Sequence, residues 1–460
     1  MECRTMLQAT MPRTAPLPPR LSDNGNWLRT ITIGLQMSRD PLQASLDLWR
    51  QHGDVFSFKV NGLPLHSFLM HPDHVQELLI THAKHIRKDA TYTDTKQGLA
   101  RFFGNGLLTS EGAFWRKQRK LAAPAFHATR VNAYAESMTR YASETLDGWQ
   151  DGAELDIAHE MMLTTLKIIS YTLLHQTDTN TAKRISEAMA RIQQFAIQNF
   201  FIPLPFPTPS TLQARQARRM LDEVIYGVIR QRRADPSDRG DLLSMLLLTE
   251  DEDGNRMSDT EARDEAVTLF LAGHETTANT MNWTFKLLAE NPEAEAKLHA
   301  ELDSVLGGRA PTLADLRALP YTNAVIKEAM RLYPPAWSFS RELLTDLEIG
   351  GYHFPKGSVV ILTSYITHRH PDFWEAPEAF RPERFLPENE GKIDKWAYIP
   401  FGGGQRVCIG QAFAMLEAAL ILATVASRYT LRLVPNRPIK RRAAITLYPE
   451  GGLPMTVHRR

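Results

Sequence analysis

The chain of 460 residues has two cysteines, and one of them, Cys408, lies in the glycine-rich segment Phe401–Gly410. An apolar run follows and predicts a buried helix that begins just after the sulfur. Unpaired backbone N–H groups and the helix dipole both favour thiolate at such a position, and thiolate is the form that ligates metals. The three glycines allow a flat ligand to come close, and Arg406 adds a cation. This combination indicates haem held by an axial thiolate.

Two ordinary interpretations of the same segment remain open at this point. Lone cysteines are mostly inert core residues, and glycine-rich loops are mostly turns. The segment is not a phosphate-binding loop, because it lacks the Gly-Lys-Ser/Thr ending that such loops have.

A second unusual stretch, Ala272–Thr277, interrupts a predicted long helix that begins at a capping box over 258–261 and ends at about Leu288. Glycine and threonine are poor helix formers, and local rules broken in this way tend to mark functional sites. The small residues leave space beside the helix, and a threonine hydroxyl can bond back to a helix carbonyl and loosen the turn. A zinc site on His274 is excluded, because Ala278 stands where the second histidine is required.

The spacing Phe-x-x-Gly-x-Arg-x-Cys-x-Gly of residues 401–410 resembles the haem-ligand signature of the cytochrome P-450 monooxygenases. Three further motifs follow the order of that family: Trp115 with Arg119, then Ala272–Thr277, then Glu328 and Arg331 together with Pro382–Phe385. The four motifs span residues 115–410. The sequence is therefore identified as resembling a soluble, bacterial-type member of the family.

The resemblance implies a mainly α protein with small β-sheets, an α+β single-domain cytochrome P-450 fold with a long central helix over the haem. We expect residues 1–37 to form an N-terminal tail and approach segment, and residues 38–460 to form the haem domain. Residues of about 50–70 and C-terminal β-structure would make a small β-rich lobe, and the rest a large helical lobe. The proline-rich stretch 203–209 would connect two lid helices, with Phe195, Phe200 and Phe201 at the entrance.

For the cofactor, the resemblance implies haem b (iron protoporphyrin IX) with Cys408 as the metal ligand. Trp115 and Arg119 would hold one propionate, Arg341 stands where the family often places a second propionate-binding arginine, and His368 is also expected to reach a propionate. The cofactor-binding residues predicted in this way are Trp115, Arg119, Ala272, Arg341, His368, Phe401, Gly402, Arg406, Cys408 and Gly410. Nearby Arg116, Lys117 and Lys120 would form a basic surface for an acidic redox partner.

For catalysis, the resemblance assigns proton delivery to the hydroxyl of Thr276, with Glu275 as the acid that supplies the protons. Glu328, Arg331 and Arg384 would form a buried charge triad behind the haem-ligand loop, with a structural role. The predicted substrate pocket consists of Phe102, Ala272, Phe339 and Leu453, the last at the tip of a C-terminal hairpin over 447–457.

The implied activity is that of a monooxygenase, an oxidoreductase acting on paired donors that inserts one oxygen atom from O2 into a C–H or C=C bond of a hydrophobic small molecule. Fatty acid, terpenoid and polyketide substrates all fit, the last two pointing to secondary metabolism. A ferredoxin- or flavodoxin-type donor with its reductase would supply electrons, since the chain ends soon after the haem-ligand loop. Two alternatives are kept: a peroxide-driven or other non-monooxygenase haem-thiolate enzyme, and a haem-thiolate binding or sensor protein. The first usually lacks the acid–alcohol pair, and the second usually carries an effector domain.

Composition limits the remaining possibilities. The net charge of +1 gives no reason to expect nucleic-acid binding. Cys3 and Cys408 cannot form a disulfide framework, which fits a reducing compartment. Neither a secretory h-region nor an uninterrupted apolar stretch of about 18 residues is present. We therefore expect a cytoplasmic monomer with no integral membrane anchor.

Overall fold

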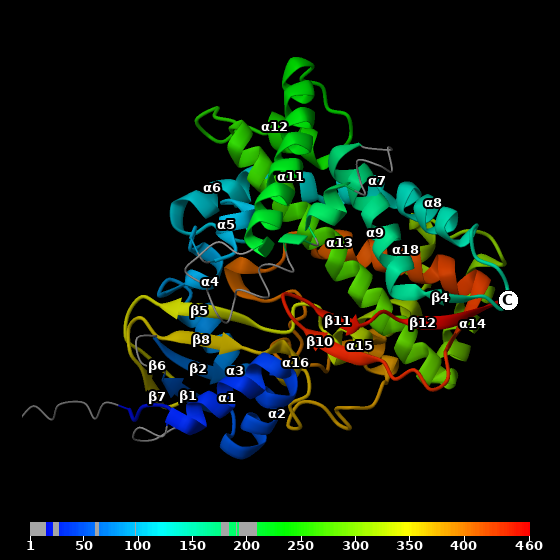
Figure 1. Cartoon of the computed structure of the whole chain (residues 1–460). Coiled ribbons are helices and arrows are strands. Elements are labelled where there is room, and N and C mark those ends of the chain that lie inside the picture. The colour runs from blue at the N-terminus through cyan, green and yellow to red at the C-terminus, as the bar shows by residue number, and fades with distance from the viewer. Residues whose placement is uncertain are drawn as a thin grey trace, which may run out of the picture.

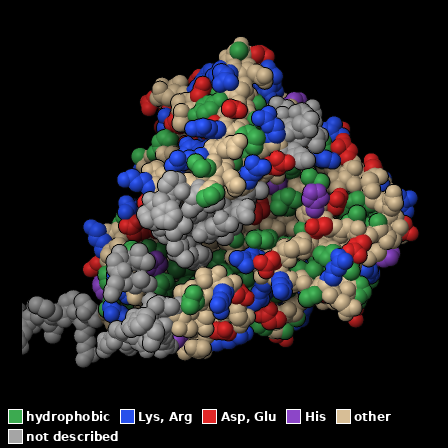
Figure 2. Space-filling view, viewed as in Figure 1, with side chains coloured by type: hydrophobic (Ala, Val, Ile, Leu, Met, Phe, Trp, Pro, Cys, Tyr) green, Lys and Arg blue, Asp and Glu red, His purple; other side chains and the backbone are tan. Residues whose placement is uncertain are grey.

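The computed structural model describes residues 15–21, 27–59, 64–96, 98–175, 184–189, 191–192 and 209–460. Helices gather on one side of the molecule, and a five-stranded sheet with α1, α2 and α3 gathers on the other (Figure 1). This is the mainly α architecture with small β-sheets that the sequence predicts. Charged side chains of both signs are interspersed over the face seen in Figure 2, in agreement with the near-zero net charge.

The α-helices are α1 (Trp27–Arg39), α2 (Pro41–His52), α3 (Pro72–Gln76), α4 (Ala90–Thr93), α5 (Ala100–Phe103), α6 (Gly112–Ala122), α7 (Ala128–Ala133), α8 (Ala135–Leu146), α9 (Ile157–Leu174), α11 (Pro209–Ala234), α12 (Leu242–Leu248), α13 (Asp259–Glu290), α14 (Pro292–Leu306), α15 (Pro320–Leu332), α16 (Ser364–Thr367), α17 (Pro387–Glu390) and α18 (Gln411–Arg428). Shorter helices are η1 (Glu77–Thr81), η2 (Ala123–Phe126), η3 (Leu313–Ala318), η4 (Pro382–Phe385) and η5 (Gly404–Arg406).

The strands are β1 (Val55–Lys59), β2 (Leu65–Leu69), β3 (Ile86–Arg87), β4 (Glu154–Asp156), β5 (Phe339–Leu343), β6 (Leu347–Ile349), β7 (Tyr352–Phe354), β8 (Val359–Leu362), β9 (Tyr429–Leu433), β10 (Lys440–Ala443), β11 (Leu447–Glu450) and β12 (Pro454–Arg459). The largest sheet has the order β1-β2-β8-β5-β3, and β4-β12-β9 form a second sheet. β10 pairs with β11, and β6 pairs with β7. In the large sheet β2 and β8 are parallel, with His66 opposite Val359, and β5 is antiparallel to β8, with Phe339 opposite Leu362.

The small lobe is larger than the stretch of about 50–70 that the sequence suggested, because β3, β5 and β8 join its sheet from far along the chain. Of the segment 1–37, residues 15–21 and the part within helix α1 also contribute to it. Helix α1 begins at Trp27 and buries Ile33, and Leu21 donates its backbone N–H to the carbonyl of Ser57. The predicted lid connection at 203–209, with Phe195, Phe200 and Phe201, lies outside the described residues.

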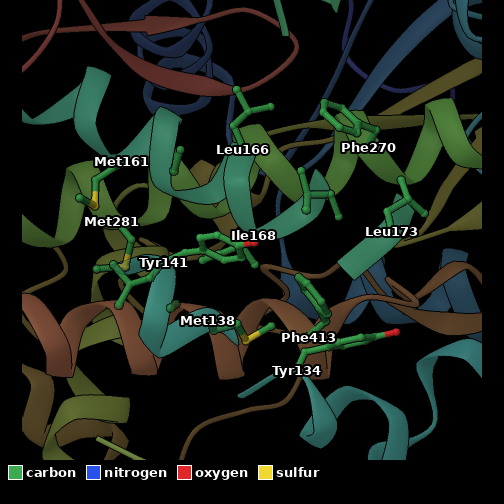
Figure 3. Close-up of a cluster of buried hydrophobic side chains, with 14 of the residues drawn as sticks. Tyr134, Met138, Tyr141, Met161, Leu166, Ile168, Leu173, Phe270, Met281 and Phe413 are labelled. Atoms are coloured by element: carbon green, nitrogen blue, oxygen red, sulfur yellow. The ribbon is translucent and has the colours of Figure 1, made fainter. Parts of the chain in front are cut away.

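Helix α13 forms as the capping box predicts: the Ser258 hydroxyl accepts from the N–H of Glu261, and the Glu261 carboxylate accepts from the N–H of Ser258. Its 32 residues span about 48 Å at 1.5 Å per residue. Apolar side chains of α8, α9, α13 and α18 meet around it in the main core (Figure 3). Each fully buried side chain of this kind contributes roughly 1.5–3 kcal/mol.

Helix α18 follows the haem-ligand segment and is strongly apolar. In the part of the chain that the structure describes, it alone has the length and composition that could cross a membrane. Most of its side chains are buried against α8, α14 and α15. Its apolar character is therefore that of a core helix.

Candidate functional site

A cavity of about 1660 Å³ lies beneath α13. Its walls come from α13, from the loop between β3 and α6, from β5, from residues 400–418 and from the turn between β10 and β11. Typical small-molecule sites enclose roughly 300–1,000 Å³, so this cavity is large enough for a macrocycle and a substrate together. Cys408 lies in its wall, and its side chain is accessible from the cavity.

The loop that carries Cys408 is shaped by its glycines. Gly402 and Gly404 have φ of 71° and 66°, values that L side chains rarely adopt. A Cβ on Gly403 would come within 2.6 Å of Trp396, and one on Gly404 within 2.6 Å of the Leu79 carbonyl oxygen. The glycines are thus required by the turn and by packing on the small lobe. That they also allow a flat ligand to come close stays a prediction.

The acidity of Cys408 differs from the expectation. Burial raises the pKa of the Cys408 thiol, while the backbone N–H of Gly410 and the charge of Arg119 lower it to a smaller extent. The effects of the helix start are therefore present but do not dominate. A thiol that coordinates a metal loses its proton outright, so iron ligation itself would have to supply the thiolate.

Cationic groups surround the same cavity. Trp115, Arg119, Arg341 and Arg406 all line it, as predicted. The guanidinium of Arg406 stacks at 3.4 Å over the Trp115 ring and donates to the carboxylate of Glu111. Its Nη1 is buried without a hydrogen-bond partner. Burial, and then the neighbouring arginines, lower the pKa of Arg406 to about 10 against the opposing effect of Glu111.

Lys88 is a fourth cation of this wall, and no motif in its local sequence marks it. Its Nζ donates to the carbonyls of Leu107, at 2.6 Å, and Ser110, at 3.1 Å. Burial and then the charge of Arg406 lower the pKa of Lys88 to about 7. Buried cations that lower one another's pKa values would be stabilised by an anionic ligand. The orphaned Arg406 Nη1 and this surplus of cations fit the two carboxylates of a haem b, with Phe401, Gly402 and Gly410 lining the cavity near Cys408.

Helix α13 forms the wall that carries the predicted acid–alcohol pair. The Thr276 hydroxyl donates to the carbonyl of Ala272 at 2.6 Å, the back-bond that the sequence predicts, yet the helix continues without a break from Asp259 to Glu290. A Cβ on Gly273 would come within 2.9 Å of Ile169 on α9. This glycine therefore packs closely against α9, and Gly273 and Ala272 are both small residues that line the cavity.

Glu275 also lines the cavity, and its carboxylate accepts a hydrogen bond from the hydroxyl of Thr446. Thr446 lies in the turn between β10 and β11, 171 residues away in sequence. Sequence reasoning missed this residue, because nothing in its local sequence marks it.

Three consecutive residues of α13 hold neighbouring elements. Asp264 and Glu265 accept the backbone N–H groups of Asn105 and Leu107, at 2.7 Å and 3.0 Å. Arg263 donates to Asp222 of α11 at 2.7 Å. The loop above the cavity and the long helix α11 are therefore both attached to the helix that carries the acid–alcohol pair.

Of the predicted substrate-pocket residues, Phe102, Ala272 and Phe339 line the cavity, but Leu453 does not. Leu453 is fully buried in the main core, and its backbone N–H donates to Asp156 at 2.8 Å. The predicted hairpin over 447–457 is wrong, because β11 pairs with β10 whereas β12 pairs with β4 and β9. The turn that reaches the cavity is the earlier one, with Ala444 and Ile445.

His368 was expected to reach a propionate, and the structure contradicts this. Its side chain is fully buried outside the cavity, and Nε2 accepts the backbone N–H of Ile399 at 2.9 Å. Burial, with a smaller effect of Arg331, lowers the pKa of His368 to about 3. The ring stays neutral and supports the segment that precedes the Cys408 loop.

The charge triad behind that loop forms as predicted. Arg331 pairs with Glu328 through two hydrogen bonds of 2.7 Å, and both side chains have no exposed surface. Arg384 approaches Glu328 at 3.4 Å. Arg331 also donates to the carbonyls of His368 at 3.1 Å and Ala379 at 3.0 Å, so it joins α15 to two loop segments.

Two surface features were weighed from the sequence. In the expected basic surface on α6, Lys117 lies 3.6 Å from Asp251 and Lys120 lies 2.5 Å from Glu252, so the acidic turn partly neutralises it. In the histidine-rich loop, His370 joins Asp54 and His71 in a group that could hold a metal. His370 Nε2 lies 3.1 Å from Asp54, which also accepts from an indole N–H. His71 Nδ1 accepts the backbone N–H of Asp73 at 3.2 Å, so hydrogen bonds within the protein account for these side chains.

Comparison with known proteins agrees with this geometry. The family model described as cytochrome P-450 matches residues 16–452. The chain is 37% identical over 438 residues to cyclooctatin synthase of Streptomyces melanosporofaciens, covering 92% of this chain and 94% of the relative. It is 34% identical to pentalenene oxygenase of Streptomyces avermitilis, covering 90% and 92%. It is 35% identical to cyclooctat-9-en-7-ol 5-monooxygenase of Streptomyces melanosporofaciens, covering 86% of each chain.

Proposed function

The chain belongs to the cytochrome P-450 family, and since it is a haem-thiolate monooxygenase of that family, we propose that it oxidises a cyclic terpenoid. Enzymes of this family bind haem b through a cysteine thiolate and use O2 together with a redox partner. The observation that carries the substrate class is the similarity to cyclooctatin synthase and pentalenene oxygenase over most of the chain. The apolar side chains of Phe102, Ala272 and Phe339 at the cavity are compatible with such a substrate.

In the proposed site Cys408 is the iron ligand, and the cations Arg119, Arg341 and Arg406 hold the propionates together with the indole of Trp115. When bound, the haem would supply the oxidising chemistry, and the thiolate of Cys408 would favour cleavage of the O–O bond. The protein contributes position and charge. The stacking of Arg406 on Trp115 fixes the guanidinium before the cofactor arrives, so little side-chain freedom is lost on binding.

Protons are proposed to reach the cavity through Glu275 and Thr276. The Glu275 carboxyl gives a proton to Thr276 Oγ1, and Thr276 passes its own hydroxyl proton into the cavity. The hydroxyl is held by its bond to the Ala272 carbonyl between transfers. We expect Thr276→Ala to lower the product formed per electron consumed by roughly tenfold or more, because general acid catalysis contributes about 10²–10⁴ in rate. Product and released peroxide measured in the same reaction check this.

The electron donor is proposed to be a ferredoxin- or flavodoxin-type protein with its own reductase, and the enzyme a cytoplasmic monomer. The exposed Arg116, beside the partly neutralised Lys117 and Lys120, is the expected contact for an acidic donor. A plant-type ferredoxin can serve as the test donor.

The test of the substrate class is a binding screen of the haem-loaded enzyme. Cyclic terpene hydrocarbons, their mono-alcohols and saturated fatty acids of equal carbon number are titrated while the optical shift that follows displacement of iron-bound water is recorded. Hits are then incubated with the ferredoxin system, and products are identified by mass spectrometry. Tight binding and oxygenation of cyclic terpenes support the proposal. Oxygenation of fatty acids alone would overturn the substrate class and leave the monooxygenase activity in place.

A further inference from the structure

We propose that Thr446, in the turn between β10 and β11, is a positioning residue that fixes the carboxylate of Glu275. This inference rests on the proposed function, in which Glu275 supplies protons to Thr276. Both Thr446 and Glu275 line the cavity. Thr446 comes from the turn between β10 and β11, and Glu275 comes from the long helix α13.

The hydrogen bonds at Thr446 have a fixed direction. The side-chain amide Nδ2 of Asn279 donates to Thr446 Oγ1 at 3.2 Å, and that amide nitrogen can only donate. Thr446 Oγ1 therefore accepts from Asn279, and its single proton is directed to Glu275. Asn282 Nδ2 in turn donates to Asn279 Oδ1 at 3.3 Å. The chain Asn282, Asn279, Thr446, Glu275 thus ends on the carboxylate.

The chain lies in a protected environment. Asn279 and Asn282 each have 1% of their surface exposed, and Thr446 has 6%. The low local dielectric of such a site strengthens each hydrogen bond of the chain. Loss of the Thr446 hydroxyl would leave the carboxylate without this donor.

The turn itself is held in place by two indoles. Trp283 donates to the carbonyl of Leu447 at 3.0 Å, and Trp337 donates to the carbonyl of Ala444 at 2.9 Å. The Trp283 ring stacks on Tyr333 with centroids 4.3 Å apart. Thr446 is therefore presented from a rigid support, which is the requirement for a group that orients a proton donor.

The test compares Thr446→Val, which keeps the shape of the side chain and removes the hydroxyl, with Thr446→Ser, which keeps the hydroxyl. The matched control is Thr424→Val, a buried threonine of α18 whose hydroxyl donates to a helix carbonyl. The haem-loaded proteins are supplied with NADPH, plant-type ferredoxin and its reductase. Oxygen-dependent NADPH oxidation is measured against pH and in D2O, without added substrate. Crystal structures of the wild type and both Thr446 variants show where the Glu275 carboxylate lies.

We expect Thr446→Val to slow oxidation roughly ten- to a hundredfold, as misplacement by about 1 Å does, and to alter its pH profile and deuterium effect. Thr446→Ser should stay within about twofold of wild type, Thr424→Val should be unchanged, and haem content should be equal in all. The Glu275 carboxylate should move in the Thr446→Val crystal only. Because the two residues act as one unit, Thr446→Val combined with Glu275→Ala should be no slower than Glu275→Ala alone.

Two outcomes distinguish the role proposed for Thr446 from the role proposed for Glu275. If Glu275→Ala slows oxidation but Thr446→Val does not, or if the double variant shows additive losses, Thr446 does not position the acid. If Glu275→Ala itself leaves the rate and pH profile unchanged, Glu275 is not the proton source, and the inference fails together with that assignment.

Discussion

The sulfur of Cys408 experiences opposing influences within the protein. Burial favours the thiol, while the N–H of Gly410 and the charge of Arg119 favour the thiolate. Arg406, Arg341 and Lys88 lie around the same cavity with depressed pKa values. The site therefore keeps its cations at a cost in free energy. A cofactor with a metal centre and anionic groups would stabilise both the thiolate and the guanidinium groups.

Replacing Cys408 by serine should remove the thiolate signature of the reduced, carbon monoxide-bound protein. A serine hydroxyl is a far weaker acid than a thiol and does not supply a soft sulfur ligand. The optical difference spectrum of wild type and Cys408→Ser, at equal haem content, checks this. An unchanged spectrum in the variant would show that another residue ligates the iron.

Glu417 on α18 gives a prediction for pH. Its carboxyl is fully buried, and no charged group lies among the causes that shift its pKa. Burial raises the pKa of Glu417 to about 8 from its ordinary 4.5, with a smaller opposing effect of Thr277. Between these values the folded protein holds a proton that the unfolded chain has lost, so stability falls as pH rises. At pH 7 this titration lowers the free energy of unfolding by about 3 kcal/mol relative to its value below pH 4.5.

Thermal unfolding of the haem-loaded protein, followed at the Soret band from pH 5 to pH 8, tests this. The midpoint of Glu417→Gln should decline less with pH than that of wild type and should be higher at pH 7.5. The exposed residue Glu388 provides the control, because Glu388→Gln should reproduce the wild-type slope. Equal slopes for wild type and Glu417→Gln would mean that Glu417 is ionised in the folded protein.

At the scale of elements, the support behind the haem-ligand loop comes from α15 and from the loop that follows α16. Arg331 joins Glu328 to the carbonyls of His368 and Ala379, and the His368 ring accepts the N–H of Ile399. The backbone just before Phe401 is therefore fixed by a buried ion pair through one neutral histidine. Its position, and with it that of Cys408, depends on contacts made outside the cavity.

Arg331→Ala should destabilise the protein by roughly 3–5 kcal/mol, because it leaves the buried Glu328 carboxylate without its partner. Haem should also be lost more readily, since the support of the loop is weakened. The thermal midpoint and the haem retained after gel filtration measure both effects. Arg317→Ala, at an exposed arginine of η3, should match wild type. Full haem retention in Arg331→Ala would show that the triad does not support the loop.

At the scale of the whole molecule, the cavity lies where the small β-rich lobe and the helical lobe meet, so haem should act as part of the core. Removing it should expose amides of residues 98–108, of the middle of α13 and of residues 400–410, while β12 stays protected. Hydrogen exchange of protein from haem-supplied and haem-deficient cultures, followed by mass spectrometry, measures this. A loss of amide protection that is spread evenly over all elements would show that haem does not stabilise these segments selectively.

Much of this arrangement could be predicted because the signals are local. The capping box at Ser258, the pair Trp115 and Arg119, and the pair Glu328 and Arg331 are each set by the periodicity of one helix. The Thr446 hydrogen bond and the cation Lys88 depend on contacts between distant segments, for which local periodicity carries no information. Leu453 was misplaced because Gly451 and Gly452 suggest a hairpin turn, whereas they allow the chain to cross from one sheet to another.

Arg263, Asp264 and Glu265 attach α11 and the loop over the cavity to α13. Glu275 and Thr276 lie about ten residues further along the same continuous helix. Any displacement of α11 that admits a bulky substrate must therefore strain helix α13, which carries Glu275 and Thr276. Substrate entry and the position of the proton-delivery residues are therefore mechanically linked. Breaking the hydrogen bond between Arg263 and Asp222 should disturb both.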